Sequence, residues 1–330
     1  MLQRSSGASG RVAFQHRSFG RYMSARALVT TASEMQAVAV AWQVYALTHR
    51  PLDLGLVGLA QFLPGILLFL MAGHAADRLP RQRILETCYA GFSCCSLLLL
   101  FLTVHGLSSV APIYLVLLVN GTVRAFNGPA GQAFLPALVP AEHFPNAVAW
   151  SSSIFQAATI VGPMAGGLLY GFTGSPVPVY ACAATGYVCA LLLISAIRVQ
   201  APERPRESPR AGIVLDGIRY IWRNKLILGA ISLDLFAVLL GGAVALLPVY
   251  AREILMVGAS GLGLLRSAPG IGAVIIALVV AIARWENTPG RPCSGAYAGS
   301  AYSPSCSASR ETWRCPWLRW SSWARAIWSA

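Results

Sequence analysis

Eight apolar stretches, each close to the length of a membrane span, constrain the fold of this chain more than any other feature. They lie at about residues 25–47, 54–76, 84–104, 110–127, 146–170, 176–197, 226–250 and 260–284. A helix needs about 20 apolar residues to cross the hydrocarbon core of a bilayer. Charged residues make up 11% of the chain, against about 25% in a typical soluble domain. The pattern predicts an all-α, polytopic membrane protein.

The basic residues predict how these spans are oriented, because Lys and Arg are concentrated in cytoplasmic loops. With a cytoplasmic N-terminus, the inner segments carry sixteen basic residues and the outer connections carry two, Arg50 and Arg252. The N-terminal residues 1–26 contain five Arg and no acid, which also suits a mitochondrial transit peptide. Because the basic residues lie between apolar runs and not on a folded domain, no nucleic-acid partner is expected.

An internal repeat links the beginning of the chain to its seventh and eighth spans. A shift of 205 residues aligns three short stretches without a gap: VYA at 44–46 with 249–251, GL at 58–59 with 263–264, and PGI at 64–66 with 269–271. Transporters are often built from duplicated bundles related by an axis along the membrane normal. The repeat therefore predicts a transporter whose second half begins near residue 210.

The expected organisation has five parts. They are a cytoplasmic segment at 1–24, a six-helix bundle at 25–197, a Pro- and Arg-rich cytoplasmic linker at 198–225, the first two helices of a second bundle at 226–284, and a tail at 285–330. The tail holds six of the nine Trp and three of the eight Cys, and has no apolar run. We expect a foreign or out-of-frame tail, with an amphipathic surface helix near its end as the alternative.

Two motifs resemble signatures of the major facilitator superfamily. Residues 73–83 (GHAADRLPRQR) resemble the loop signature Gly-x-x-x-Asp-Arg-x-Gly-Arg-Arg, although Pro80 replaces the second Gly. Residues 162–167 (GPMAGG) resemble the Gly-Pro-x-x-Gly-Gly motif of antiporters in that superfamily. The chain is similar to the enterobactin-exporter-like branch of proton-driven efflux carriers. Further support comes from HRSF at 16–19, WQVY at 42–45, LPALVP at 135–140 and LPVYAR at 247–252.

This resemblance covers roughly residues 14–284 and implies a major facilitator fold with a complete first bundle and two helices of the second. It implies a monomeric carrier in the bacterial cytoplasmic (inner) membrane, with its N-terminus in the cytoplasm. Such a carrier exports a small amphiphile, such as a siderophore or a drug, by alternating access coupled to protons. No nucleotide-binding loop, zinc motif or nucleophile elbow appears, so neither a cofactor nor a metal is expected.

Three charged residues inside or near the spans are candidates for proton coupling. Glu34 in the first span and Asp234 in the seventh are the carboxylates well inside spans, and charges at membrane depth usually line a cavity. Arg124, followed by Gly128, resembles the Arg-x-x-x-Gly pattern on the fourth span of the superfamily. The alternatives are a structural hydrogen bond for each carboxylate and an interfacial, snorkelling side chain for Arg124.

The two motifs give two further sets of candidates. Resemblance implies that Gly73, Asp77, Arg78 and Arg81 form a conformational latch between the inward and outward states. The arginines of this loop also serve to fix topology, with or without a latch. The antiporter motif, listed by its small residues and proline, comprises Gly162, Pro163, Gly166 and Gly167. It is expected to act as a hinge, with close helix packing as the plain alternative.

Four aromatic residues in the first bundle are candidates for substrate contact, namely Trp42, Tyr45, Phe62 and Phe126. Aromatic side chains of membrane proteins more often pack or anchor at the interface. A rival hypothesis for the whole chain is a truncated fragment that transports nothing, because alternating access needs two bundles around one site. A membrane-embedded enzyme would need His, Asp or Ser clustered at one depth, and the sequence shows no such cluster.

Overall fold

The computed structural model describes residues 12–106, 109–197, isolated positions between 222 and 232, and 241–286. Residues 1–278 form one compact unit and 279–330 a second; the account below concerns the first. Every regular element in the described part is helical. Asp234, nearly all of the expected linker at 198–225 and the tail beyond residue 286 lie outside the described residues.

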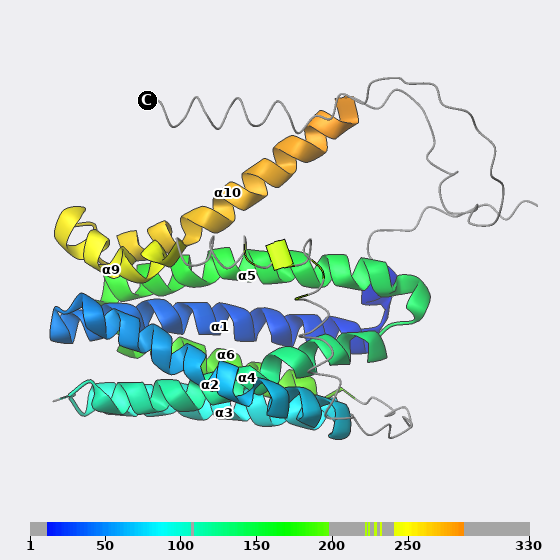
Figure 1. Ribbon diagram of the computed structural model, residues 1–330, viewed down its shortest axis with the longest axis horizontal. Helices are drawn as coiled ribbons and strands as arrows, with labels where there is room; N and C mark the ends of the chain where they lie inside the picture. Colours follow the sequence, from blue (N-terminus) through cyan, green and yellow to red (C-terminus); the bar gives the residue numbers. More distant parts are fainter. Residues whose placement is uncertain are drawn as a thin grey trace, which may run out of the picture. The chain divides into compact units, whose positions relative to one another are not determined.

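Six long helices cover the six spans that were predicted for the first bundle (Figure 1). They are α1 (Arg17–Thr48), α2 (Pro51–Arg78), α3 (Arg81–Val104), α4 (Ala111–Phe134), α5 (Phe144–Thr173) and α6 (Val177–Ser195). By length and composition, α2, α3, α5 and α6 could each cross a membrane. Helices α1 and α4 carry Glu34 and Arg124 within their length.

Local sequence explains where these helices begin and end. Proline lacks a backbone N–H and suits the first turn of a helix. It occupies the first turn of four of the helices, as Pro51, Pro112, Pro145 and Pro178. Helix α5 ends at Gly174, whose φ of 64° places it in the left-handed region and whose N–H donates to the Tyr170 carbonyl. Glycine adopts that conformation without strain, so it ends the helix cleanly.

The packing of the six helices has an internal symmetry. Helix α1 packs against α5 and α6, α4 packs against α2 and α3, and α3 also packs against α6. This set of five contacts stays the same when α1 is exchanged with α4, α2 with α5, and α3 with α6. Two groups of three helices with opposite direction produce this pattern, and inverted three-helix repeats are found within each half of major facilitator carriers.

The two ends of the bundle can be told apart by their contacts. At one end, Tyr22 donates to the Gly131 carbonyl and Arg21 donates to the Ala196 carbonyl. The start of α1 therefore lies beside the ends of α4 and α6, and this end gathers the segments expected to be cytoplasmic. It is called the inner end below. At the other, outer end, the Tyr114 hydroxyl donates to the Asp53 carboxylate.

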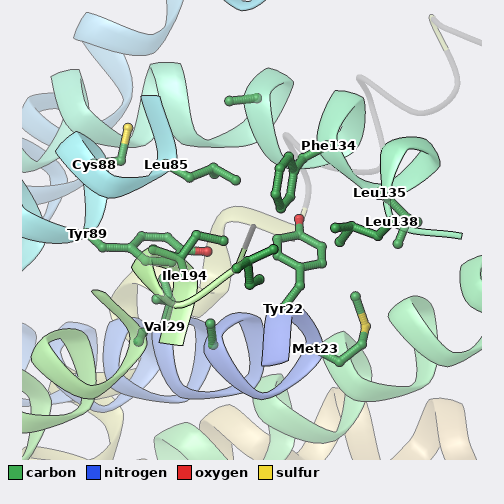
Figure 2. Packing of buried hydrophobic residues seen from close by; sticks show 14 of the residues in the cluster. Tyr22, Met23, Val29, Leu85, Cys88, Tyr89, Phe134, Leu135, Leu138 and Ile194 are labelled. Carbon is green, nitrogen blue, oxygen red and sulfur yellow. The ribbon is translucent and has the colours of Figure 1, made fainter. Parts of the chain in front are cut away.

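Two apolar clusters fill the bundle. The inner cluster surrounds Tyr22, Tyr89 and Phe134, with the rings of Tyr22 and Phe134 packed edge to face at 5.2 Å (Figure 2). The outer cluster surrounds Tyr180, which is fully buried and donates to the Gln43 side chain. The Tyr22 and Tyr180 hydroxyls thus each have an acceptor, which offsets the cost of removing them from water.

The bounds of the helix that follows the linker agree with the 205-residue offset of the repeat. Helix α10 (Gly258–Glu286) matches α2 (Pro51–Arg78) when α2 is moved by the 205-residue offset, to within a few residues at each end. Both helices contain a proline in their interior, Pro64 in α2 and Pro269 in α10. A short irregular segment precedes α10, ending in a π-helical turn at Tyr250–Ile254.

Candidate functional site

Glu34 lies in the middle of α1 at a point where α5 comes very close. The helices approach because Gly162 of α5 has no side chain, and a Cβ built on it would lie 2.6 Å from Glu34 Cβ and 3.0 Å from the Thr31 carbonyl oxygen. Glu34 itself is half-buried. The antiporter motif thus positions the acidic residue of α1 through direct backbone contact.

Helix α10 lies against α1 and brings a second charge to the same depth. Leu262 of α10 is buried against Val38 of α1. In a helix, residues four apart lie on one face, so Glu34 follows Val38 toward the inner end and Arg266 follows Leu262 in the same direction. The charge of Glu34 attracts the Arg266 guanidinium.

Two further groups take part in this electrostatic cluster. Arg124 of α4 repels the Arg266 guanidinium, and the charges of Arg124 and Glu34 both act on the Tyr187 hydroxyl of α6. Tyr187 is fully buried, beside Ser33 of α1, and its ring stacks on Phe92 at 5.4 Å. The Glu34 carboxylate of α1 and the Arg124 guanidinium of α4 therefore both act electrostatically on Arg266 of α10 and on Tyr187. We call these residues, Glu34, Arg124 and Arg266, the charge cluster.

The four residues of the expected hinge divide between two neighbours of α5. Gly162 and Gly166 meet α1, and a Cβ on Gly166 would lie 2.8 Å from Met35 Cα. Pro163 and Gly167 meet α10, and a Cβ on Gly167 would lie 2.6 Å from Gly263 Cα. Helix α5 is therefore held between α1 and α10. Whether it also acts as a hinge remains a prediction.

The four aromatic residues that were expected to contact the substrate do not lie together. Trp42 and Tyr45 of α1 share a cluster at the outer end, where the Arg252 guanidinium lies 5.9 Å from each ring centroid. The Tyr45 hydroxyl donates to the Glu253 carboxylate. Phe62 lies on α2 with 69% of its side chain exposed, and Phe126 packs against the inner cluster. Trp42 and Tyr45 thus contact the segment that precedes α10.

The expected latch lies at the turn between α2 and α3. Gly73, Asp77 and Arg78 belong to the last turns of α2, where Arg78 is exposed and a Cβ on Gly73 would have nothing within 4 Å. Arg81 begins α3 and donates to the Ala133 carbonyl near the end of α4. The neighbouring Gln82 donates to the Ile194 carbonyl at the end of α6. These two hydrogen bonds connect the start of α3 to the inner ends of α4 and α6.

The sequence analysis did not single out Arg266, although a charged residue inside an apolar stretch could have been noticed. Arg266 lies inside the eighth apolar stretch, and a charge at membrane depth normally lines a cavity or has a partner. Arg252 was counted only as an outer-loop charge, while the structure places it over two aromatic rings. In the described residues, no three His, Cys, Asp or Glu side chains gather as a metal site would require.

Comparisons with known proteins agree with this architecture. A family model described as "Transmembrane secretion effector" matches residues 8–303. The enterobactin exporters EntS of Shigella boydii serotype 4, Salmonella typhimurium and Escherichia coli are each 30% identical over 274 residues, which is 80% of this chain and 63% of the relative. The chain thus spans less than two thirds of the length of these relatives, which are named as exporters and not as enzymes.

A solved structure shows a related fold. It is a bacterial homologue of the human lysosomal transporter Spinster, in an inward-facing and unoccupied conformation. The two chains are 16% identical with a TM-score of 0.63, and the match covers 85% of this chain and 65% of that one. Together with the helical bundle and its apolar helices, these matches identify a multi-pass membrane protein. The chain belongs to the transmembrane secretion effector family of the major facilitator superfamily.

Proposed function

We propose that this protein is a secondary active transporter of the cytoplasmic membrane that exports a small amphiphilic molecule in exchange for protons. The observation that carries the proposal is the charge cluster, in which Glu34 of α1 lies against Gly162 of the antiporter motif and its charge acts on Arg266 of α10. The named activity of its relatives makes enterobactin the first substrate to test. The N-terminus lies in the cytoplasm in this proposal.

In the proposed cycle, Glu34 carries the proton. When Glu34 is charged, it attracts Arg266 and favours contact between α1 and α10. Protonation removes that attraction, whose strength is greater in a site of low dielectric than in water. Proton binding at Glu34 therefore favours separation of the two helices, which is the movement that alternating access between two halves requires.

The two motifs have supporting roles in this cycle. Helix α5 offers a close, small-residue surface to both α1 and α10, so the halves can rearrange without opening a leak beside Glu34. The turn with Asp77 and Arg81 is proposed as the latch at the inner end. Its anchor is the Arg81 hydrogen bond to the Ala133 carbonyl of α4.

The test measures enterobactin export from cells that lack their own exporter and produce this chain. We expect export to depend on the pH gradient, and Glu34→Gln to reduce it more than about tenfold because the proton carrier is lost. Glu142→Gln is the matched control, since Glu142 is an exposed carboxylate on the turn before α5.

Each other outcome has a distinct meaning. Unchanged export in Glu34→Gln would remove this residue from the mechanism. Export that persists without a pH gradient would contradict proton coupling. A wild-type chain that is present in the membrane but exports nothing would support the alternative of a fragment without transport activity.

A further inference from the structure

The outer end of α1 is joined to the π-helical turn before α10 by polar and aromatic contacts. The Arg252 guanidinium carbon lies 5.9 Å from the ring centroids of both Trp42 and Tyr45. The Tyr45 hydroxyl donates a hydrogen bond to the Glu253 carboxylate. Trp42 and Tyr45 belong to the first bundle, whereas Arg252 and Glu253 follow the linker. We call these four residues the outer clasp.

The outer clasp lies beside an apolar contact between the same two parts of the chain. Val38 of α1 is fully buried, in a cluster with Ala251 of the π-helical turn and Leu262 of α10. Trp42 also packs against this cluster, whose remaining members all follow the linker. Val38 therefore stays buried only while α1 remains in contact with the segment that follows the linker.

The backbone that carries Arg252 and Glu253 has an unusual conformation. The Leu255 N–H donates to the Tyr250 carbonyl at 2.8 Å, across the wide turn of a π-helix. Met256, just beyond it, has a φ of 52° in the left-handed region, where residues other than glycine are uncommon. Single π-helical turns and such backbone outliers occur often at functional sites. The turn is therefore a candidate for a moving part.

The contacts of the outer clasp differ in how much they favour closure. A guanidinium over an aromatic ring is attracted to it. Nη1 of Arg252, however, is buried without a hydrogen-bond acceptor in the described part of the chain, and a buried donor without an acceptor costs a free energy of similar size. The ring contacts are thus offset. The hydrogen bond from Tyr45 to the exposed Glu253 therefore decides whether the outer clasp is closed.

We propose that the outer clasp is the outer gate of the transport path, and that the Tyr45–Glu253 hydrogen bond holds it closed. The gate opens when this bond breaks, which returns the Glu253 carboxylate and the Arg252 N–H group to water. Trp42 and Tyr45 then act in closure and not in binding the substrate. The inference rests on the proposed function for the opening step, and it adds the residues that keep the outer side closed.

The test measures how fast a charged, water-soluble maleimide reacts with Val38→Cys in the whole purified chain in lipid nanodiscs. Both faces of a nanodisc are accessible, so the rate does not depend on orientation. Peptide mass spectrometry separates position 38 from the eight native cysteines. In the Val38→Cys background we expect Tyr45→Phe to speed labelling about fivefold, as the loss of one net hydrogen bond does.

Two further variants sharpen the test. Glu253→Ala breaks the same bond, so the double variant with Tyr45→Phe should react no faster than either single variant. Tyr114→Phe is the matched control. It removes a hydrogen bond from a tyrosine hydroxyl to the Asp53 carboxylate at the same outer end, but between two helices of the first bundle. Its labelling rate should equal that of the Val38→Cys background.

An unchanged rate in Tyr45→Phe would overturn the inference. An equal increase in Tyr114→Phe would do the same, because it would indicate general loosening of the bundle. If Val38→Cys does not fold, Ala41→Cys replaces it, since Ala41 is buried in one cluster with Tyr45. The measurement needs no transport. Faster labelling in a chain that exports nothing would uphold the closing bond and overturn the proposed function, while active export with unchanged labelling would do the reverse.

Discussion

The two faces of α5 make different kinds of contact. On the face toward α1, the glycines belong to α5, with Gly162 against Glu34 and Gly166 against the Met35 backbone. On the face toward α10, both helices supply glycines: Gly167 meets Gly263, and Gly270 of α10 receives the Ile160 side chain of α5. Helix α5 thus has a one-sided glycine contact with α1 and a two-sided glycine contact with α10.

This difference suggests which contact stays and which one moves. Where both helices carry glycine, as at Gly167 and Gly263, fewer side chains obstruct a small displacement than where one helix carries its full side chains. The one-sided contact lies within the first bundle, and the two-sided contact lies against the helix that follows the linker. Alternating access requires movement at the second contact and none at the first.

The largest effect on stability is expected from Gly166→Ala in the one-sided contact with α1. The new Cβ would lie 2.8 Å from Met35 Cα and 2.9 Å from the Met35 carbonyl oxygen, and backbone cannot move aside. We expect a loss of about 1–3 kcal/mol, measured by thermal unfolding of the purified chain in detergent. The control is Gly55→Ala on α2, where a Cβ has nothing within 4 Å. Equal stability of the two variants would show that the α1–α5 contact is loose.

A smaller loss of stability and a larger loss of transport are expected from Gly263→Ala. Its Cβ would lie 2.5 Å from the Pro163 carbonyl oxygen and 2.9 Å from Gly167 Cα, so α10 must shift outward and a side chain then stands in the two-sided glycine contact. We expect about 1 kcal/mol of lost stability and a clear fall in export rate, with both measured on one preparation. A stability loss as large as that of Gly166→Ala, with normal export, would reverse the comparison.

The smallest effect is expected from Ser267→Ala. The Ser267 hydroxyl lies 2.8 Å from the Ile160 carbonyl oxygen of α5 and 2.9 Å from the Gly263 carbonyl oxygen of its own helix. Both carbonyls belong to helices, so losing the hydroxyl should cost at most about 1 kcal/mol. Export should be unchanged or faster, because one hydrogen bond between α5 and α10 is gone. A strong decrease would identify Ser267 as part of the transport path.

The helices of the first bundle could be predicted from hydropathy, but their ends could not. The first span was expected from residue 25, whereas α1 begins at Arg17; the fourth was expected to end at 127, whereas α4 ends at Phe134. Apolar runs report the thickness of the hydrocarbon core. A helix continues beyond it when tertiary contacts hold its polar ends, as the Tyr22 hydrogen bond to the Gly131 carbonyl does here.

The charge cluster was only partly predictable. Glu34 and Arg124 were predicted from the sequence as charged residues inside or near spans. Arg266 was not singled out, because the stretch around it is apolar on average. Its partner could not be found by sequence spacing, because 232 positions separate Arg266 from Glu34. The roles expected for Trp42 and Tyr45 depended likewise on contacts between distant segments, and the structure gives both rings a cation from the turn before α10.

The arginines at the inner end have a consequence for how such a chain is made. Arg21 caps the last carbonyls of α6 and Arg81 those of α4, where positive side chains are favoured. The same guanidinium groups belong to the basic excess that predicts a cytoplasmic inner end. In that predicted orientation, an arginine that helps to retain a hairpin on the cytoplasmic side also connects neighbouring helices after folding. Membrane insertion and helix packing thus depend on the same side chains. A charge reversal at Arg21 or Arg81 would therefore disturb both the orientation of the helices and the contacts between them.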